Sequence, residues 1–374
     1  MRVLHLAYQP GRLREVASLT VLIEWYRSDV VIAVHDFVSF ARMIDGMHHA
    51  SDTEWFGHPR GLSTLFFTEM WERFSYYGMR ALLILFMTDM VVSGGLGMND
   101  ATATAIYGLY TFAVYAVALP GGWIADRLLG QRKAVLWGGV VIAAGHFTMA
   151  VPITSAFYLG LTLIVLGTGL LKPNVSAIVA ELYPKGGARR DAGFSVFYMG
   201  INVGALAGPL VCGTLGESVN WHLGFSAAGI GMVLGITQYV WGWRYLGDAG
   251  LLRASPDERV HALRTFLLGI MLVASLVVVL FGLQSGGLLT LSFLNVAQGT
   301  GLFITLLVVV YFAYVFLFGE LTPDERKRVA VIPLLFLAAA VFFSGFEQAG
   351  SSMNLFAERL TDRVVFGWQA PASW

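Results

Sequence analysis

The sequence predicts an all-α polytopic membrane protein, and three observations lead to that prediction. Hydrophobic residues make up 56% of the 374 residues and charged residues only 13%, about half the charged share of an ordinary soluble domain. The mean hydropathy is +0.68. Nine apolar segments of spanning length follow one another from residue 62, and about 20 such residues cross a bilayer. A soluble fold would leave much of this apolar surface exposed.

Charge and cysteine content exclude several other classes of protein. The 24 Lys and Arg residues balance 24 Asp and Glu residues, so no electrostatic bias points to nucleic acid. Cys212 is the single cysteine, which excludes a disulfide framework and a thiolate metal site. The sequence has no zinc-binding HExxH pattern, serine elbow or phosphate loop. We therefore do not expect an enzyme.

Residues 1–60 differ in composition from the rest of the chain. They hold 13 charged residues, against 35 in the other 314. Four charges interrupt the apolar run near 17–41, namely Glu24, Arg27, Asp29 and Asp36. Each would cost roughly 2.5–3.5 kcal/mol at the centre of a spanning helix. We interpret residues 1–60 as an atypical extension, neither a span nor a signal peptide; a start misassigned upstream of Met43 or Met47 is the alternative.

The nine predicted spans follow in order. They lie near 62–92, 102–127, 134–152, 156–182, 193–216, 222–246, 265–283, 296–318 and 329–357. The first and last are long and contain charges, which is compatible with a tilted helix whose charges face a water-filled cavity.

Basic residues alternate between the links that join these spans. The second, fourth, sixth and eighth links each carry three: Arg127, Arg132 and Lys133; Lys185, Arg189 and Arg190; Arg253, Arg259 and Arg264; Arg326, Lys327 and Arg328. The other four links carry none. The positive-inside rule then places the N-terminus in the cytoplasm.

The second link belongs to a motif, GGWIADRLLGQRK, at residues 121–133. Its glycines permit close helix approach and a tight turn. Four charged residues lie in it, namely Asp126, Arg127, Arg132 and Lys133. An ordinary basic loop is one interpretation. The pattern also resembles the loop signature of the major facilitator superfamily, which implies a conformational element rather than a substrate site.

The first span contains EMWERFSYYGMR, residues 69–80, with polar groups three or four residues apart. These are Glu69, Glu72, Arg73, Tyr76, Tyr77 and Arg80. The spacing puts them on one stripe of a helix. Four of the six are ionisable, so the stripe cannot face lipid cheaply and must line a cavity or meet partners. A structural ion-pair cluster and a site for substrate and protons are the two interpretations.

Later spans hold further polar groups. Lys172 precedes Pro173 in GTGLLKPN and needs a carboxylate partner or an anionic ligand. Asn202 in FYMGINVGAL reads as a buried group that binds substrate or joins two helices. Glu347 in FEQAGSS lies in an apolar run. Tyr115 and His146 are weaker signals, and His146 is more typical of a packed polar residue than of a proton relay.

Together these motifs resemble the proton-dependent oligopeptide transporter family. The resemblance rests on the ExxER run at 69–73, FYxxIN at 197–202, GxxKPN at 169–174 and FEQ at 346–348, in that order, and covers roughly residues 55–374. It implies a major facilitator fold with an N-terminal six-helix bundle at 61–247. Residues 248–328 would form a linker with two inserted helices. Residues 329–374 would hold the first helix of the C-terminal bundle and the start of an external loop.

The resemblance also implies a function and assigns residues to it. The function is import of di- and tripeptides with protons across the inner or plasma membrane, by a monomer that needs no metal or other cofactor. Proton coupling would involve Glu69, Glu72, Arg73, Arg80 and Glu347. Substrate binding would involve Arg73, Tyr76, Tyr77, Arg80, Tyr115, Lys172, Asn202 and Glu347. Because the first and last spans face each other in this fold, we expect ionised Glu347 to pair with Arg80.

Two points stay open at the level of sequence. The family resemblance does not fix the cargo, so an amino acid, nitrate or a peptide-like compound is the alternative substrate. Family members continue for five more spans beyond the position of Trp374. We therefore expect this chain to be a C-terminally truncated, incomplete form.

Overall fold

The computed structural model describes residues 55–374. The expectation for the N-terminal extension therefore lies almost wholly outside the described residues. The chain divides into two units, Met1–Arg60 and Gly61–Trp374, and the second unit carries all the helices treated below.

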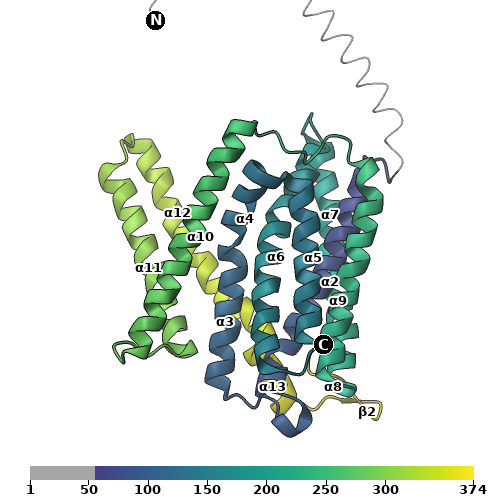
Figure 1. The fold of residues 1–374 in the computed structure, drawn as a ribbon. Helices are drawn as coiled ribbons and strands as arrows, with labels where there is room; N and C mark the ends of the chain where they lie inside the picture. Colours follow the sequence, from purple (N-terminus) through teal and green to yellow (C-terminus); the bar gives the residue numbers. More distant parts are fainter. Residues whose placement is uncertain (1–54) are drawn as a thin grey trace, which may run out of the picture. The chain divides into compact units, whose positions relative to one another are not determined.

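The first part of this unit is a bundle of long helices (Figure 1). In chain order these are α2 (Gly61–Thr88), α3 (Asp100–Ala116), α4 (Ala118–Ile124), α5 (Gln131–Met149), α6 (Thr154–Glu181), α7 (Ala188–Gly208), α8 (Thr214–Ser218) and α9 (Trp221–Gly242). A π-helical turn, Ala125–Leu129, extends α4, and another, Pro209–Gly213, joins α7 to α8. Thus α3–α4 and α7–α8 each form one rod.

The second part comprises α10 (Pro256–Ser285), α11 (Phe293–Phe318), α12 (Pro323–Phe346) and α13 (Ser352–Leu360), then a short antiparallel pair of strands, β1 (Val364–Val365) and β2 (Trp368–Gln369). The sequence explains where α10 and α12 begin. Ser255 and Thr322 cap them, each followed by Pro and, three residues after the cap, by a Glu that bonds back to it. This capping box satisfies otherwise unpaired backbone N–H groups.

Each of the nine predicted spans overlaps one of these helices or one of the two continuous helix pairs, α3–α4 and α7–α8. Seven helical segments of the described part are long and apolar enough to cross a membrane. The other two predicted spans, α2 and α5, are not among them. The helix α2 carries the charged stripe, and α5 is less apolar because it begins with Gln131, Arg132 and Lys133.

The last span differs from its predicted extent of 329–357. The α12 helix starts earlier, at Pro323, and ends at Phe346; a 3₁₀ turn, Glu347–Gly350, and a break at Ser351 separate it from α13. Glu347 therefore does not lie inside a continuous helix, as the apolar run suggested. It lies at the break, where the chain changes direction.

The core lies along α2, which packs against α7 and α9. The ring of Phe86 meets those of Phe157 and Phe225 at centroid distances of 5.5 and 5.2 Å. On the α7 side, a Cβ at Gly204 would lie 2.9 Å from both the Arg73 Cβ and the Phe74 nitrogen. The missing side chain lets α7 approach α2 beside the predicted charged stripe.

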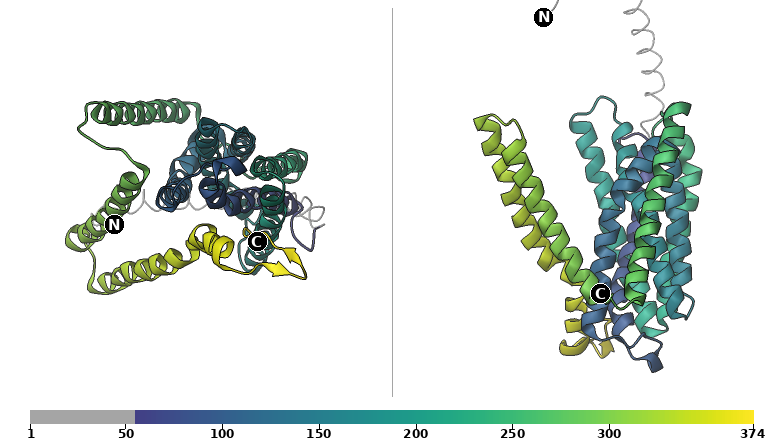
Figure 2. Two further views of the ribbon diagram at one scale, coloured as in Figure 1. Left: turned by 90° about the horizontal axis from the view of Figure 1, so that it is seen from below. Right: turned by 60° about the vertical axis from the view of Figure 1, so that its left-hand side comes forward.

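The helices α10, α11 and α12 pack very little. In the view from below they lie outside the α2–α9 bundle (Figure 2, left), and the apolar stretch of each helix is 0% buried within the unit. The residues they expose are mostly Leu, Val and Phe. Such surfaces are suited to lipid.

Candidate functional site

Three charged side chains of α2 are buried together; we call Glu69, Glu72 and Arg73 the α2 charge cluster. Each is less than 5% exposed. The Arg73 Nε atom lies 2.9 Å from Glu69 Oε1 and 2.6 Å from Glu72 Oε2. Two carboxylates thus share one guanidinium in a place from which water is largely excluded. Removing any one charge would leave the others poorly compensated.

Arg73 also lies over the ring of Tyr76, 5.4 Å from its centroid. Tyr76 is buried and meets Tyr77, which is half-buried, in an edge-to-face contact. The predicted stripe therefore exists as one continuous surface of α2. It combines charges with aromatic faces, the two features that suit a zwitterionic organic ligand.

Lys172 approaches the same region from α6. Its Nζ lies 4.4 Å from the centroid of the Tyr115 ring on α3. In the described part of the chain, no carboxylate lies within ion-pair distance of Lys172, so the purely structural pair with a glutamate of the first span is not formed. Arg73 and Glu72 are the charged groups that act most strongly on it. Lys172 is half-buried, so its ammonium is left with an aromatic partner only.

Arg80 and Glu347 form the second charged centre, as expected from the sequence. The Arg80 Nη2 atom lies 2.5 Å from Glu347 Oε2, and the two side chains are 7% and 23% exposed. The Arg80 Nε also donates to the hydroxyl of Tyr107. Tyr107 in turn donates to the Glu347 carbonyl oxygen at 3.3 Å. The break after α12 is thereby fastened to α2 and α3.

The segment after Glu347 continues this contact along one end of the bundle, called here the α13 end (residues 347–374 against α2, α3 and α8). Asn354 donates to the Ala81 carbonyl at 2.8 Å. The Arg359 guanidinium donates two hydrogen bonds to the Asp100 carboxylate, of 2.8 and 3.0 Å. Neither contact could be predicted from the sequence, because groups on helices that are far apart in the chain form no local pattern.

Glu217 of α8 holds the last residues of the described chain at the same end. Its carboxylate accepts the backbone N–H of Ala372 at 2.7 Å and of Ser373 at 2.8 Å. Arg363 lies 3.7 Å from it. Together with Arg80–Glu347, these contacts close the α13 end.

The sequence predicted that Asn202 is buried and that His146 is a packed residue. Asn202 is exposed, and its amide donates to the Tyr198 carbonyl of its own helix at 3.1 Å. It lies on the side of α7 opposite Gly204, so the expectation of a buried group was wrong. His146 is fully buried, and neither ring nitrogen has a hydrogen-bond partner in the described residues, in line with a packed residue.

The predicted conformational loop packs at the opposite end of the bundle. Gly130 has a φ of +79°, which glycine adopts without strain. The Arg132 side chain donates to the carbonyls of Ala249 and Gly247. Asp126, Arg127 and Lys133 are exposed. The motif therefore ties the start of α5 to the turn that follows α9.

The sequence also matches a protein-family model. The family model described as PTR2, the POT family, matches residues 132–374. The chain belongs to the POT family. Members of this family are transporters, not enzymes, and the fold is that of the major facilitator superfamily.

Individual POT-family relatives agree. "Peptide transporter YePEPT" of Yersinia enterocolitica is 42% identical over 330 residues, covering 85% of this chain and 64% of that protein. "Uncharacterized transporter YclF" of Bacillus subtilis is 43% identical over 321 residues, with the same coverage. This chain thus spans less than two thirds of the length of these relatives.

Solved structures of POT transporters match closely as well. A crystal structure of a peptide transporter POT in complex with sulfate aligns with a TM-score of 0.78 at 42% identity, covering 86% of this chain and 65% of that one. A POT family transporter in complex with 5-aminolevulinic acid aligns at 0.76 and 37% identity, covering 86% and 67%.

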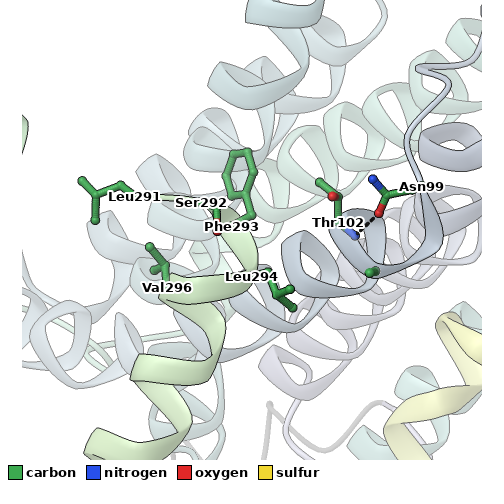
Figure 3. A pocket seen from close by; sticks show the side chains of 8 residues that line it. Asn99, Thr102, Leu291, Ser292, Phe293, Leu294 and Val296 are labelled. Carbon is green, nitrogen blue, oxygen red and sulfur yellow. Dashed lines mark hydrogen bonds between the residues drawn. The ribbon is translucent and has the colours of Figure 1, made fainter. Parts of the chain in front are cut away.

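A pocket of about 510 Å³ lies elsewhere, between the starts of α3 and α11 (Figure 3). Asn99, Thr102, Ser292 and Leu294 are among its lining residues, none of which is charged. Asn99 is already used to cap α3 through the Thr102 N–H. Its lining offers no charged group that would pair with a charged ligand.

Proposed function

We propose that the protein is a proton-coupled symporter that imports di- and tripeptides across the cell membrane. The observation that carries this proposal is the α2 charge cluster together with Lys172, a half-buried cation that has no carboxylate within ion-pair distance among the described residues, in a POT-family chain. A peptide presents a carboxylate at one end. Arg73 and Lys172 are the cations available to it in the described residues, and their attraction exceeds that at a wet surface.

The aromatic and polar neighbours complete the proposed substrate site. Tyr76, Tyr77 and Tyr115 supply ring faces and hydroxyl groups beside the two cations. Asn202, exposed on α7, remains available to hydrogen-bond a ligand. The ammonium end of the peptide needs an anionic group. Glu347, in the turn after α12, supplies it only after it has given up its proton again and before it pairs again with Arg80.

Proton coupling is assigned to the two charged centres. Ionised Glu347 holds Arg80 and keeps the α13 end closed. When Glu347 takes a proton, the ion pair is lost, Arg80 becomes free for the peptide carboxylate, and the α13 end opens. Arg80 stays charged throughout. Glu69 and Glu72 set the charge around Arg73 and form the second protonation centre. The proposal needs protons as coupling ion, no other cofactor and one copy of the chain.

Small amino-acid-like solutes are a second candidate substrate class, because a related transporter was crystallised with one. The POT family transporter that is 37% identical was crystallised with 5-aminolevulinic acid, a compound with both an amine and a carboxylate. The same cations and rings would suit a small amino-acid-like solute.

The experiment is uptake of a labelled dipeptide by vesicles that hold the protein expressed from its complete gene, with an imposed pH gradient. We expect Lys172→Ala to reduce uptake to background, because the substrate carboxylate loses one of its two cations. Lys185→Ala is the matched control, since Lys185 is an exposed lysine in the turn after α6, and should transport normally. Competition by 5-aminolevulinic acid compares the two substrate classes. Unchanged uptake by Lys172→Ala would remove Lys172 from the site.

A further inference from the structure

Tyr110 of α3 is a buried tyrosine whose hydroxyl has no hydrogen-bond partner among the described residues. The residue is 4% exposed. A buried hydroxyl without a partner carries a desolvation cost that is rarely tolerated without a reason. The residue pattern did not point to Tyr110, because a tyrosine on an apolar helix face is ordinary core.

The surroundings of Tyr110 point to its use. It lies one turn from Tyr107, which binds Arg80. The groups that act on it electrostatically are Tyr76, Glu72, Arg80 and Tyr107, from α2 and α3. Tyr110 thus lies one turn along α3 from the contact with Arg80, on a helix that packs against α2.

An unpaired acceptor lies on the facing helix. Glu72 Oε2 lies 2.6 Å from Arg73 Nε as an ion pair, but both carboxylate oxygens of Glu72 are buried and receive no hydrogen bond from the described residues. Besides Tyr110, the charged groups that face Glu72 are Arg73 and Glu69 on α2 and Lys172 on α6. A buried donor and a buried acceptor thus lie unsatisfied within electrostatic reach of each other.

We propose that Tyr110 is a positioning residue for the transport cycle, whose hydroxyl donates to the Glu72 carboxylate when Arg73 turns to a substrate carboxylate. This inference rests on the proposed function, in which Arg73 has two alternative anionic partners. Without another donor, Glu72 would be left as an uncompensated buried charge in that state and would take up a proton. Tyr110 therefore sets how readily Glu72 is protonated once substrate is bound.

The test isolates the state in which Arg73 has left Glu72. Infrared difference spectroscopy of the purified protein in nanodiscs follows the protonated carboxyl band against pH, and Glu72→Gln identifies the Glu72 component. The Arg73→Gln variant represents the state in which Arg73 binds a substrate carboxylate and no longer pairs with Glu72. In that background we expect Tyr110→Phe to move the midpoint of Glu72 protonation upward by about one pH unit, the effect of losing a hydrogen bond to a charged group.

Two comparisons separate this role from a merely structural one. With Arg73 intact, Tyr110→Phe should shift the midpoint by less, since the guanidinium still holds the carboxylate. Tyr239→Phe is the matched control: it removes a buried hydroxyl that donates to the Arg132 carbonyl, and it should leave the midpoint unchanged. The infrared readout does not depend on transport, so failure of the proposed function would show separately, as absent uptake by the unmodified protein. Identical midpoints with and without the Tyr110 hydroxyl in both backgrounds would overturn the inference.

Discussion

Replacing Glu347 by Gln should open the α13 end of the bundle. The change removes the negative charge that faces Arg80 at 2.5 Å and leaves an amide of the same shape. Two unit charges about 4 Å apart attract each other by about 4 kcal/mol at the effective dielectric of a protein surface. Desolvation of both groups offsets part of this. We expect the closed arrangement to lose about 2 kcal/mol, which is roughly a 30-fold change in the ratio of closed to open forms.

The loss should be partial because other contacts remain at this end. The Arg80 Nη2 still reaches the Glu347 carbonyl oxygen at 3.3 Å. The Asn354–Ala81 and Arg359–Asp100 hydrogen bonds are also untouched. The variant should therefore populate open and closed forms side by side, not adopt a single open form.

The assay is the distribution of distances between two spin labels. Val92, after α2, and Met353, in α13, are both exposed and suit labelling. At neutral pH the labelled Glu347→Gln variant should show an additional population with a longer distance between the two labels. The labelled protein with Glu347 intact should gain that population only when the pH is lowered. Glu320→Gln is the matched control, because Glu320 is an exposed carboxylate before α12. Identical distributions in Glu347→Gln and the unmodified protein would refute the reasoning.

Three further outcomes are expected. Glu347→Gln should lose peptide uptake driven by a pH gradient yet retain peptide counterflow, which needs no net proton movement; accumulation in response to pH would exclude it as the coupling carboxylate. Gly204→Val should lower stability by about 1–3 kcal/mol in thermal unfolding, because its side chain would collide with α2 beside Arg73, whereas Gly269→Val, with open space around it, should not. A cysteine at Arg189 should react with a membrane-impermeant thiol reagent only from the cytoplasmic side; labelling from outside would reverse the predicted orientation.

The membrane-spanning plan could be predicted because hydrophobicity acts along each segment independently. Every predicted span coincides with helix in the structure, but the predicted starts near 265 and 329 were too late. The helices α10 and α12 begin at Pro256 and Pro323, where Ser255 and Thr322 cap them. The break after Phe346 was not predictable in this way. The residues after Phe346, EQAGSSMN, are mostly small or polar, but this composition alone does not locate a break. In the structure Arg80 and Tyr107 bind the Glu347 region where the helix ends.

The charged part of the site could be predicted for a physical reason as well. A charge in an apolar segment has to find a partner. The family resemblance implied that the spans of Arg80 and Glu347 face each other, so the two were expected together, and they lie together. Polar groups that are neutral carry no such requirement. Asn202 was therefore wrongly predicted to be buried. Tyr110 was not singled out, since tyrosine rings are common in apolar cores. The Arg359–Asp100 and Glu217 contacts join segments far apart in sequence and depend on the fold itself.

The most direct test is accumulation of a labelled dipeptide in vesicles that contain the protein expressed from its complete gene. With the outside more acidic than the inside, we expect peptide to accumulate above its external concentration. Collapse of the pH gradient by a protonophore should abolish accumulation while exchange continues. Equal uptake with and without the gradient would contradict proton coupling, and absence of any peptide uptake or exchange would contradict peptide transport itself.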